Sequence, residues 1–317
     1  MWTFRKCPTV EIISHKKIKV NTFSSFLMKI NQISPQEAKF TEVLETIAVK
    51  PKILYFNGKL PENVVKTVGI VGARKCTPYG EKVAYEAAFE LAKAGVVIVS
   101  GLAYGVDSVA SRAALDAGGV TVAVLGTPID EIYPREHIRL AEEIVQNGGA
   151  IISEYGPGEK LDYKLSFLYR NRLIAGLSQM VLITEAAERS GTLNTAMHTL
   201  DQGKELFVAP GDITRITSVG CNRLIAQGAR VYTRPSDILE ELYPGGLPGE
   251  ECSSNVPVFS GSPTEKAIAG KISEGVLGGE KIIEELGISA AEFAQSITML
   301  EIKGVVRPLG MNNWMLR

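Results

Sequence analysis

Glycine-rich groups follow three apolar segments of this chain, at positions where a phosphate could bind. Glycine lets backbone N–H groups approach a ligand, and a helix that begins just after such a loop favours an anion at its N-terminus. A tight turn is the alternative interpretation of any single loop. Three such loops, with Arg74 in one of them, favour a phosphate pocket. The predicted pocket residues are Gly72, Ala73, Ser100, Gly101, Gly105, Ser190, Gly191 and Thr192.

The segment KLSFLYRNRLIAGLS (164–178) is the most specific candidate binding element. It carries three cations, an amide and two aromatic rings immediately before the apolar run MVLIT (180–184). Arginine and lysine match phosphates, and Phe167 or Tyr169 could stack on an unpaired base, so the segment indicates single-strand binding. A solvated helix face with Phe167 in the core is the alternative interpretation.

No set of catalytic residues is evident. GxxxxGK[ST] is absent and GxGxxG is missing after the first strand, so ATP and NAD use is disfavoured. His137 and His198 have no nucleophile or metal-ligand spacing around them. Glu185 or Glu154 could act as acid or base, and a nucleotide hydrolase or phosphoribohydrolase is therefore the alternative function. ERSGTLNTA (188–196) lacks the flanking glycines of the PGGxGTxxE-like loop in such enzymes, so we expect a protein that binds and does not catalyse.

Strands and helices must hold these residues in place. The sequence predicts them, because apolar runs of strand length alternate with segments of helical periodicity. Such runs resemble parallel strands buried on both faces. We expect a Rossmann-like, doubly wound α/β fold with a mostly parallel sheet, in which ligands bind at the carboxyl ends of the strands. The predicted strands are VGIVG (68–72), VVIVS (96–100), VTVAVLG (120–126), AIIS (150–153), MVLIT (180–184), ELFVAP (205–210) and ARVYT (229–233).

Changes in composition divide the chain into four parts. Residues 1–63 are predicted to be partly helical, with a helix over 34–50 capped by Ser34 and an extended segment at 52–60. Residues 64–243 form the Rossmann-like domain. A Gly-, Pro- and Ser-rich linker (244–263) leads to a small winged-helix domain (264–317), with helices at 280–287 and from Ser289 to Lys303 and then a hairpin.

Composition excludes several classes of protein. Apolar residues are 45% and charged residues 22% of the 317 residues, which is ordinary for a globular protein. No apolar run is long enough to span a bilayer, and the first residues lack a signal-peptide pattern, so we expect a cytoplasmic protein. Cys7, Cys76, Cys221 and Cys252 are scattered, which predicts neither a metal site nor disulfides. With a net charge of −1, nucleic-acid binding must depend on a local cluster of cations.

Several motifs in order resemble one family, the DprA/Smf proteins of bacterial DNA processing. They are Gly72-Ala73-Arg74, SGLAYGVDSVA (100–110), FLYRNRLIAGLS (167–178), EAAERSGTLNTA (185–196) and PGDITRITSVGCNRLIAQGA (210–229). The resemblance covers about residues 52–243. It departs from the family at Ala73, where serine is expected, and at Leu168, where proline is expected.

The resemblance implies a recombination mediator that binds single-stranded DNA, protects incoming DNA and helps to load the RecA recombinase in natural transformation. It also implies a homodimer. Because the nucleotide-binding motifs are missing, we expect no cofactor. The winged helix has six Lys/Arg against seven Asp/Glu, so we do not expect it to read duplex DNA. A small-molecule sensor that docks a partner through this domain is a third alternative. The DNA-binding residues implied by the resemblance are Arg74, Lys164, Phe167, Arg170, Asn171 and Arg172.

Overall fold

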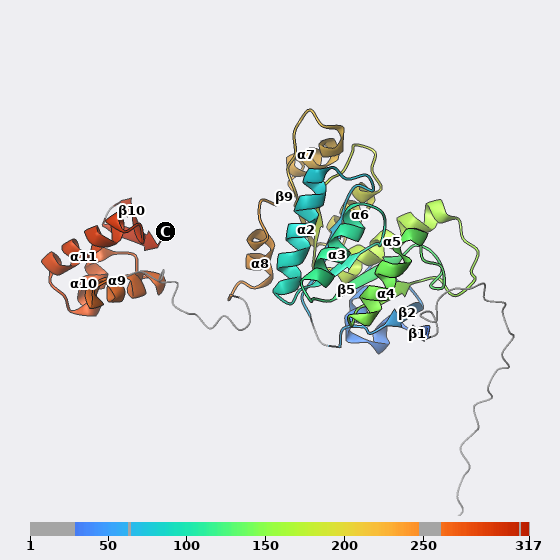
Figure 1. Cartoon of the computed structure of the whole chain (residues 1–317), viewed down its shortest axis with the longest axis horizontal. Coiled ribbons are helices and arrows are strands. Elements are labelled where there is room, and N and C mark those ends of the chain that lie inside the picture. Colours follow the sequence, from blue (N-terminus) through green and yellow to red (C-terminus); the bar gives the residue numbers. More distant parts are fainter. Residues whose placement is uncertain (1–28, 63–64, 247–260, 311, 317) are drawn as a thin grey trace, which may run out of the picture. The chain divides into compact units, whose positions relative to one another are not determined.

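The structure, a computed structural model, describes residues 29–62, 65–246, 261–310 and 312–316. The chain divides into two compact units, Met1–Leu242 and Tyr243–Arg317, which are described separately below (Figure 1). Cys7, Cys252, most of the segment 1–33 and much of the predicted linker lie outside the described residues. No helix of the described residues combines the length and the hydrophobicity that crossing a membrane requires.

A single mixed sheet forms the centre of the larger unit, and it confirms the predicted Rossmann-like, mostly parallel architecture. Its first two strands are antiparallel to each other, and the second pairs antiparallel with β6; the other strand pairs are parallel. In sheet order the strands are β1 (Asn31–Ile33), β2 (Leu54–Gly58), β6 (Ala150–Ser153), β5 (Thr121–Leu125), β4 (Val97–Ser100), β3 (Thr67–Val71), β7 (Met180–Ile183), β8 (Glu205–Val208) and β9 (Arg230–Val231).

The strand order reverses between β3 and β7, which are neighbours although more than 100 residues separate them in the chain. From β3 the chain winds outward through β4, β5 and β6, then crosses back to β7 and winds the other way. Because such crossovers are right-handed, the two directions of winding place their helices on opposite faces of the sheet. The reversal creates a crevice at the carboxyl ends of β3 and β7.

Helices connect the parallel strands in the expected alternation. α2 and α3 pack side by side, as Figure 1 shows, and α5 packs against α6. Gly95 has a φ of +82°, a conformation that glycine adopts without strain, and it ends α2 as the sequence predicts. The helices of this unit are α1 (Lys39–Glu42), α2 (Pro78–Lys93), α3 (Val106–Asp116), α4 (Ile138–Gln146), α5 (Tyr163–Leu177), α6 (Thr192–Asp201), α7 (Val219–Ala226) and α8 (Ser236–Leu242).

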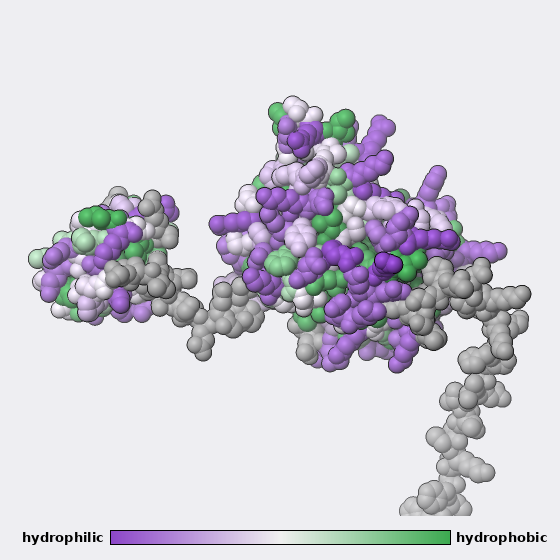
Figure 2. Space-filling model, viewed as in Figure 1, coloured by the Kyte–Doolittle hydropathy of each residue, from purple (hydrophilic) through white to green (hydrophobic). Residues whose placement is uncertain are grey.

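The core consists of the central strands and the helix faces packed on them. Every residue of β3 and β5 is buried, which explains their continuous apolar sequences. Hydrophilic residues cover much of the visible surface of this unit, with hydrophobic residues in scattered groups (Figure 2). The carboxyl ends of the central strands are therefore anchored in a buried apolar core.

The single helix predicted over residues 34–50 is wrong. The segment forms two 3-10 turns, Pro35–Glu37 and Val43–Thr46, on either side of the short α1. The break is at Ala38, whose backbone is extended (φ −135°, ψ 132°). The break accompanies burial of Phe40, Leu44 and Ile47 in the core that α5 also covers, so tertiary packing overrides the local helical pattern.

The smaller unit has the predicted helices followed by a two-stranded hairpin. It contains α9 (Pro263–Ser273), α10 (Gly279–Leu286), α11 (Ala290–Ile302), β10 (Val306–Gly310) and β11 (Asn313–Leu316). The helix α9 was not predicted. Its signals were Ser262, whose hydroxyl accepts from the Glu265 amide, and Pro263 at the first helical position, both at the border of the predicted linker.

Candidate functional site

A cavity of about 430 Å³ lies at the carboxyl ends of β3 and β7, at the reversal of strand order. Five separate segments of the larger unit contribute to its walls, so the fold brings together residues that are far apart in the chain. They are Val71 to Lys75, Ala103 and Asp107, Phe167 to Ile174, Ala187 to Thr195, and Thr217. This is the place where doubly wound sheets bind ligands.

The walls of the cavity are electropositive. In the described part of the chain, four cationic side chains line it against one carboxylate, that of Asp107. The cations are Arg74, Lys75, Arg170 and Arg189. A concave surface with this excess of positive charge attracts phosphate groups even though the chain as a whole is slightly acidic.

Phe167 forms an aromatic wall of this cavity. The guanidinium carbon of Arg74 lies 5.3 Å from the centre of its ring, and that of Arg170 lies 5.9 Å from it. Gly126 makes room for the ring, because a Cβ there would lie 2.5 Å from Phe167 Cδ1. A planar ring flanked by cations suits an unpaired base attached to a phosphate.

Arg170 is buried beside the cavity, and its hydrogen bonds stabilise the backbone that forms the cavity floor. Its Nη1 donates to the carbonyl oxygens of Gly101 (2.7 Å) and Val124. Burial lowers the pKa of Arg170 to about 10, and the neighbouring Asp107 opposes that shift. A Cβ on Gly101 would lie 2.6 Å from both the Arg170 guanidinium and the Asp107 carboxylate, so glycine is required there for close approach.

The loop 190–192 is fixed from two sides. Asn171 Nδ2 donates to the Gly191 carbonyl (3.3 Å) and to Asn194 Oδ1 (3.1 Å). Thr192 Oγ1 donates to the Gly72 carbonyl (3.0 Å), which joins this loop to the loop after β3. The Thr192 amide donates to Ser190 Oγ (3.2 Å), so it already has a partner within the loop.

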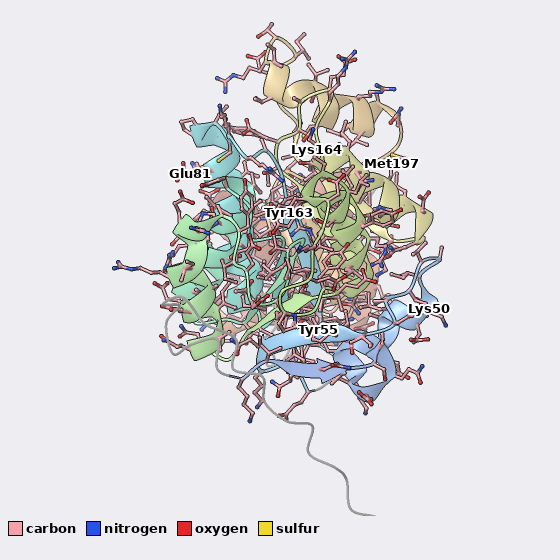
Figure 3. The ribbon with its side chains drawn as sticks, turned by 90° about the vertical axis from the view of Figure 1, so that its right-hand side faces the viewer. Lys50, Tyr55, Glu81, Tyr163, Lys164 and Met197 are labelled. Atoms are coloured by element: carbon pink, nitrogen blue, oxygen red, sulfur yellow. The ribbon has the colours of Figure 1, made fainter. Side chains whose placement is uncertain are left out.

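Not all predicted site residues reach the cavity. Lys164 is exposed on the first turn of α5 but is not part of the lining; Figure 3 shows it next to Tyr163. Ser100 is fully buried, and its hydroxyl donates to the Ile70 carbonyl (2.7 Å). Gly105 is the N-cap residue of α3, with a φ of +73°, and a Cβ there would lie 2.3 Å from the Ala73 carbonyl oxygen. Ser100 and Gly105 therefore support the loop after β3 without lining the cavity.

Arg172 lies away from the cavity. It is buried, and its Nη2 donates to both carboxylate oxygens of Glu154, each at 2.7 Å. The ion pair also occupies Glu154, one of the two carboxylates considered as an acid or base.

Glu185, the other candidate acid or base, is also bonded within the protein. Its carboxylate accepts from the Thr77 amide (2.8 Å), the Thr77 hydroxyl (2.6 Å) and the Thr217 hydroxyl (3.2 Å). Among the residues that the structure describes, neither Glu185 nor Glu154 belongs to the cavity lining. The carboxylate binds the start of α2, where the helix dipole favours negative charge.

Sequence reasoning missed Lys75, Asp107 and Arg189, which all line the cavity. Lys75 and Arg189 directly adjoin Arg74 and Ser190, and both were assigned to no site although a cation next to a phosphate loop is a usable signal. In the described residues no cluster of His, Cys, Asp and Glu has the composition of a metal site.

A family model described as DNA recombination-mediator protein A matches residues 31–243. The chain is 44% identical over 192 residues to the protein Smf of Escherichia coli, a match that covers 61% of this chain and 51% of that protein. It is 40% identical over 199 residues to the DNA processing protein DprA of Streptococcus pneumoniae, with 63% and 70% of the two chains covered. The match thus spans about half the length of the first relative.

Two solved structures share the fold of the larger unit. The X-ray structure of DNA processing protein A from Streptococcus pneumoniae has a TM-score of 0.62 and 37% identity, covering 69% of this chain and 76% of that one. DNA processing protein A from Helicobacter pylori, described for its single-stranded DNA binding mode, has a TM-score of 0.60 and 32% identity, covering 68% and 96%.

Proposed function

This chain belongs to the DNA recombination-mediator protein A family, as its motifs indicate, and we propose that it binds single-stranded DNA without changing it chemically. The observation that carries the proposal is the electropositive cavity at the carboxyl ends of β3 and β7, in which Arg74 lies over the ring of Phe167. The binding mode described for the Helicobacter pylori relative supports the same ligand.

Each predicted contact residue has a role in this proposal that follows from its position. Arg74 neutralises a phosphate at the mouth of the cavity, and Phe167 stacks on or supports a base. Lys164, exposed on the first turn of α5, holds a phosphate of a neighbouring nucleotide. Arg170 and Asn171 act as positioning residues, because their hydrogen bonds hold the floor and the loop 190–192.

Arg172 lies on another side of α5 and does not contact DNA in this proposal. Its hydrogen bond to Glu154 stabilises the helix instead. Lys75 and Arg189 add positive charge to the cavity. We include in the proposal that the protein, in the cytoplasm, protects incoming DNA and assists loading of a RecA-type recombinase in natural transformation. A strand-exchange assay with RecA, with and without this protein, tests that step.

We also propose that the protein is a homodimer. Met197 and Leu200, three residues apart on α6, are 61% and 53% exposed, and Val231 in the edge strand β9 is 44% exposed. Exposed apolar side chains and an unpaired strand edge are features that a second subunit can cover. Two grooves in one particle would raise the affinity for a long strand by effective concentration. Light scattering at micromolar concentration checks this, since the mass of a single chain would contradict it.

The direct test of the function is fluorescence anisotropy with a labelled oligo-dT of about 30 nucleotides, longer than one typical single-strand site. We expect tight binding by the wild type that weakens as salt rises, because cations release counterions from the strand. Arg74→Ala and Lys164→Ala should each weaken binding severalfold and reduce its salt dependence. Arg139→Ala and Lys93→Ala, which remove exposed cations from α4 and α2, are the matched controls.

Binding that is absent, or that does not respond to Arg74→Ala, would contradict the proposal. The hydrolase alternative is tested in the same preparation by incubation with nucleoside monophosphates and chromatography of the products. Release of free base would show that the protein is an enzyme. No observation favours that outcome, since the Glu185 and Glu154 carboxylates are both bonded within the protein.

A further inference from the structure

Two tyrosines extend the aromatic wall of the cavity outward. The ring centre of Tyr133 lies 5.5 Å from that of Phe167, and the ring centre of Tyr163 lies 6.3 Å from it. Tyr133 comes from the loop after β5, and Tyr163 begins α5 after β6. Since β5 and β6 are neighbours in the sheet, the segments that follow their carboxyl ends place Tyr133 and Tyr163 beside Phe167.

Both tyrosine rings are accessible. Tyr133 is 42% and Tyr163 38% exposed, although each ring contacts that of Phe167. The Tyr163 hydroxyl donates to Glu131 Oε2 at 2.6 Å, which fixes the ring in place. This hydrogen bond raises the pKa of Tyr163 to about 12. Figure 3 shows Tyr163 and the neighbouring Lys164 at the start of α5.

We propose that Tyr133, Phe167 and Tyr163 form an aromatic platform that stacks bases of the nucleotides next to the one held at the cavity. The proposal rests on the proposed function and names a second set of contacts for the same strand. Aromatic rings suit this task because every base has a π-face, so stacking tolerates any sequence. The three ring centres are close enough for consecutive bases to use neighbouring rings.

The charges around the platform favour bases over the sugar-phosphate backbone. Asp130 and Glu131 lie near the Tyr163 hydroxyl, and their carboxylates disfavour phosphates at that point. Arg74 lies over the Phe167 ring, and Lys164 precedes Phe167 by three residues on α5, so these two cations provide places for the phosphates instead. A strand that meets this pattern turns its bases toward the rings. Duplex DNA cannot do so, because its bases are paired and stacked, and the platform therefore selects single strands.

The test compares ring removal with ring retention, by anisotropy with an oligo-dT of about 12 nucleotides. Tyr133→Leu and Tyr163→Leu keep apolar packing and remove the ring. We expect each to weaken binding about fivefold or more, because stacking on an aromatic ring adds substantially to the affinity for each base. Tyr133→Phe and Tyr163→Phe keep the ring and should bind like the wild type.

Tyr85→Leu is the matched control. Tyr85 is 38% exposed, its hydroxyl donates to Asp116 at 3.0 Å, and its ring stacks on Phe89, but it lies on α2 away from the platform. We expect no change in affinity. An oligomer of the same length with abasic residues at all but one position gives a second control, since loss of a platform ring should not matter when the one base left is held at the cavity and no neighbouring base remains to stack.

A stacking readout separates a contact from a merely structural role. A 2-aminopurine placed next to the 5′ or 3′ side of a central thymine should lose fluorescence on binding to the wild type, and the loss should be smaller with Tyr133→Leu or Tyr163→Leu. If both variants bind and quench like the wild type while Arg74→Ala binds weakly, the platform is wrong and the proposed function stands. If the wild type binds no oligomer, both are wrong.

Discussion

Arg170 and Arg172 are two residues apart on α5, but only Arg170 lines the cavity, whereas Arg172 pairs with Glu154. Side chains at i and i+2 of a helix point in nearly opposite directions. Arg170 therefore reaches the floor of the cavity, while Arg172 reaches Glu154. In the described structure two further nitrogen atoms of Arg172, Nε and Nη1, are buried without a hydrogen-bond partner. The Glu154 carboxylate is thus the main compensation for a buried charge.

Removing that carboxylate should destabilise the protein without changing the site. We expect Glu154→Ala to lower the free energy of unfolding by about 2 to 4 kcal/mol, because it leaves the Arg172 guanidinium buried and unpaired. Glu143→Ala breaks the ion pair of Glu143 with Arg112, whose side chains are 41% and 45% exposed, and should cost under about 1 kcal/mol. Urea unfolding measures both.

The affinity of folded Glu154→Ala for single-stranded DNA should stay within about twofold of the wild type, since neither partner of the pair lines the cavity. A large loss of affinity in a folded variant would mean that Arg172 contacts the DNA after all.

The residues of the site could be predicted in part. Arg74 and Phe167 stand out by type, and both line the cavity. The opposite orientation of Arg170 and Arg172 follows from helical periodicity, but which of them faces the cavity depends on how α5 docks on the sheet. Lys75 and Arg189 could have been found as cations next to the predicted loops, whereas Asp107 belongs to the lining through packing between distant segments, which no local pattern contains.

At the scale of elements, the loop before α6 offers the sharpest test of the phosphate pocket. Gly191 has φ −60° and ψ −22°, a conformation open to any residue, and a Cβ there would meet no atom within 4 Å. Glycine is therefore not required at this position by the fold. A ligand that occupies the space in front of the loop is a reason for the absence of a side chain.

We expect Gly191→Ala to keep the melting temperature of the wild type and to weaken single-strand binding severalfold, because the added methyl group takes space intended for a phosphate. Gly270→Ala, also with open space around its Cβ but in α9 of the other unit, is the control and should leave binding unchanged. Differential scanning fluorimetry and anisotropy measure the two quantities. Unchanged binding by Gly191→Ala would remove this loop from the DNA site.

Elements were predictable where their pattern is regular. All seven apolar runs are strands, because parallel strands buried on both faces leave a continuous apolar signature. β9 is much shorter than its run, Arg230–Val231, and both of its residues are exposed at the sheet edge. The segment from Ser34 failed because its break at Ala38 is set by the burial of Phe40 and Leu44, which helical periodicity alone does not reveal.

At the scale of the whole molecule, every residue that lines the cavity lies between Val71 and Thr217, within the larger compact unit. The smaller unit has its own core, in which Phe293 packs against Trp314. Each unit thus has the interior that independent folding requires.

A chain shortened to residues 1–246 should therefore fold and bind a short oligomer with the wild-type affinity, within about threefold. The oligomer should be about 12 nucleotides long, near the size of a single site. Circular dichroism checks folding and anisotropy checks binding. A folded chain of this length with a tenfold weaker affinity would show that the smaller unit takes part in holding the strand.

The bonds of Glu185 to Thr77 and Thr217, and of Thr192 to Gly72, also have a consequence for synthesis on the ribosome. These contacts join segments that are translated far apart in time, and such long-range contacts form late in folding. A nascent chain that has reached β6 contains Arg74 but neither Phe167 nor the partners that fix the loops. On the proposed function, incomplete chains therefore lack the contacts that would bind single-stranded DNA.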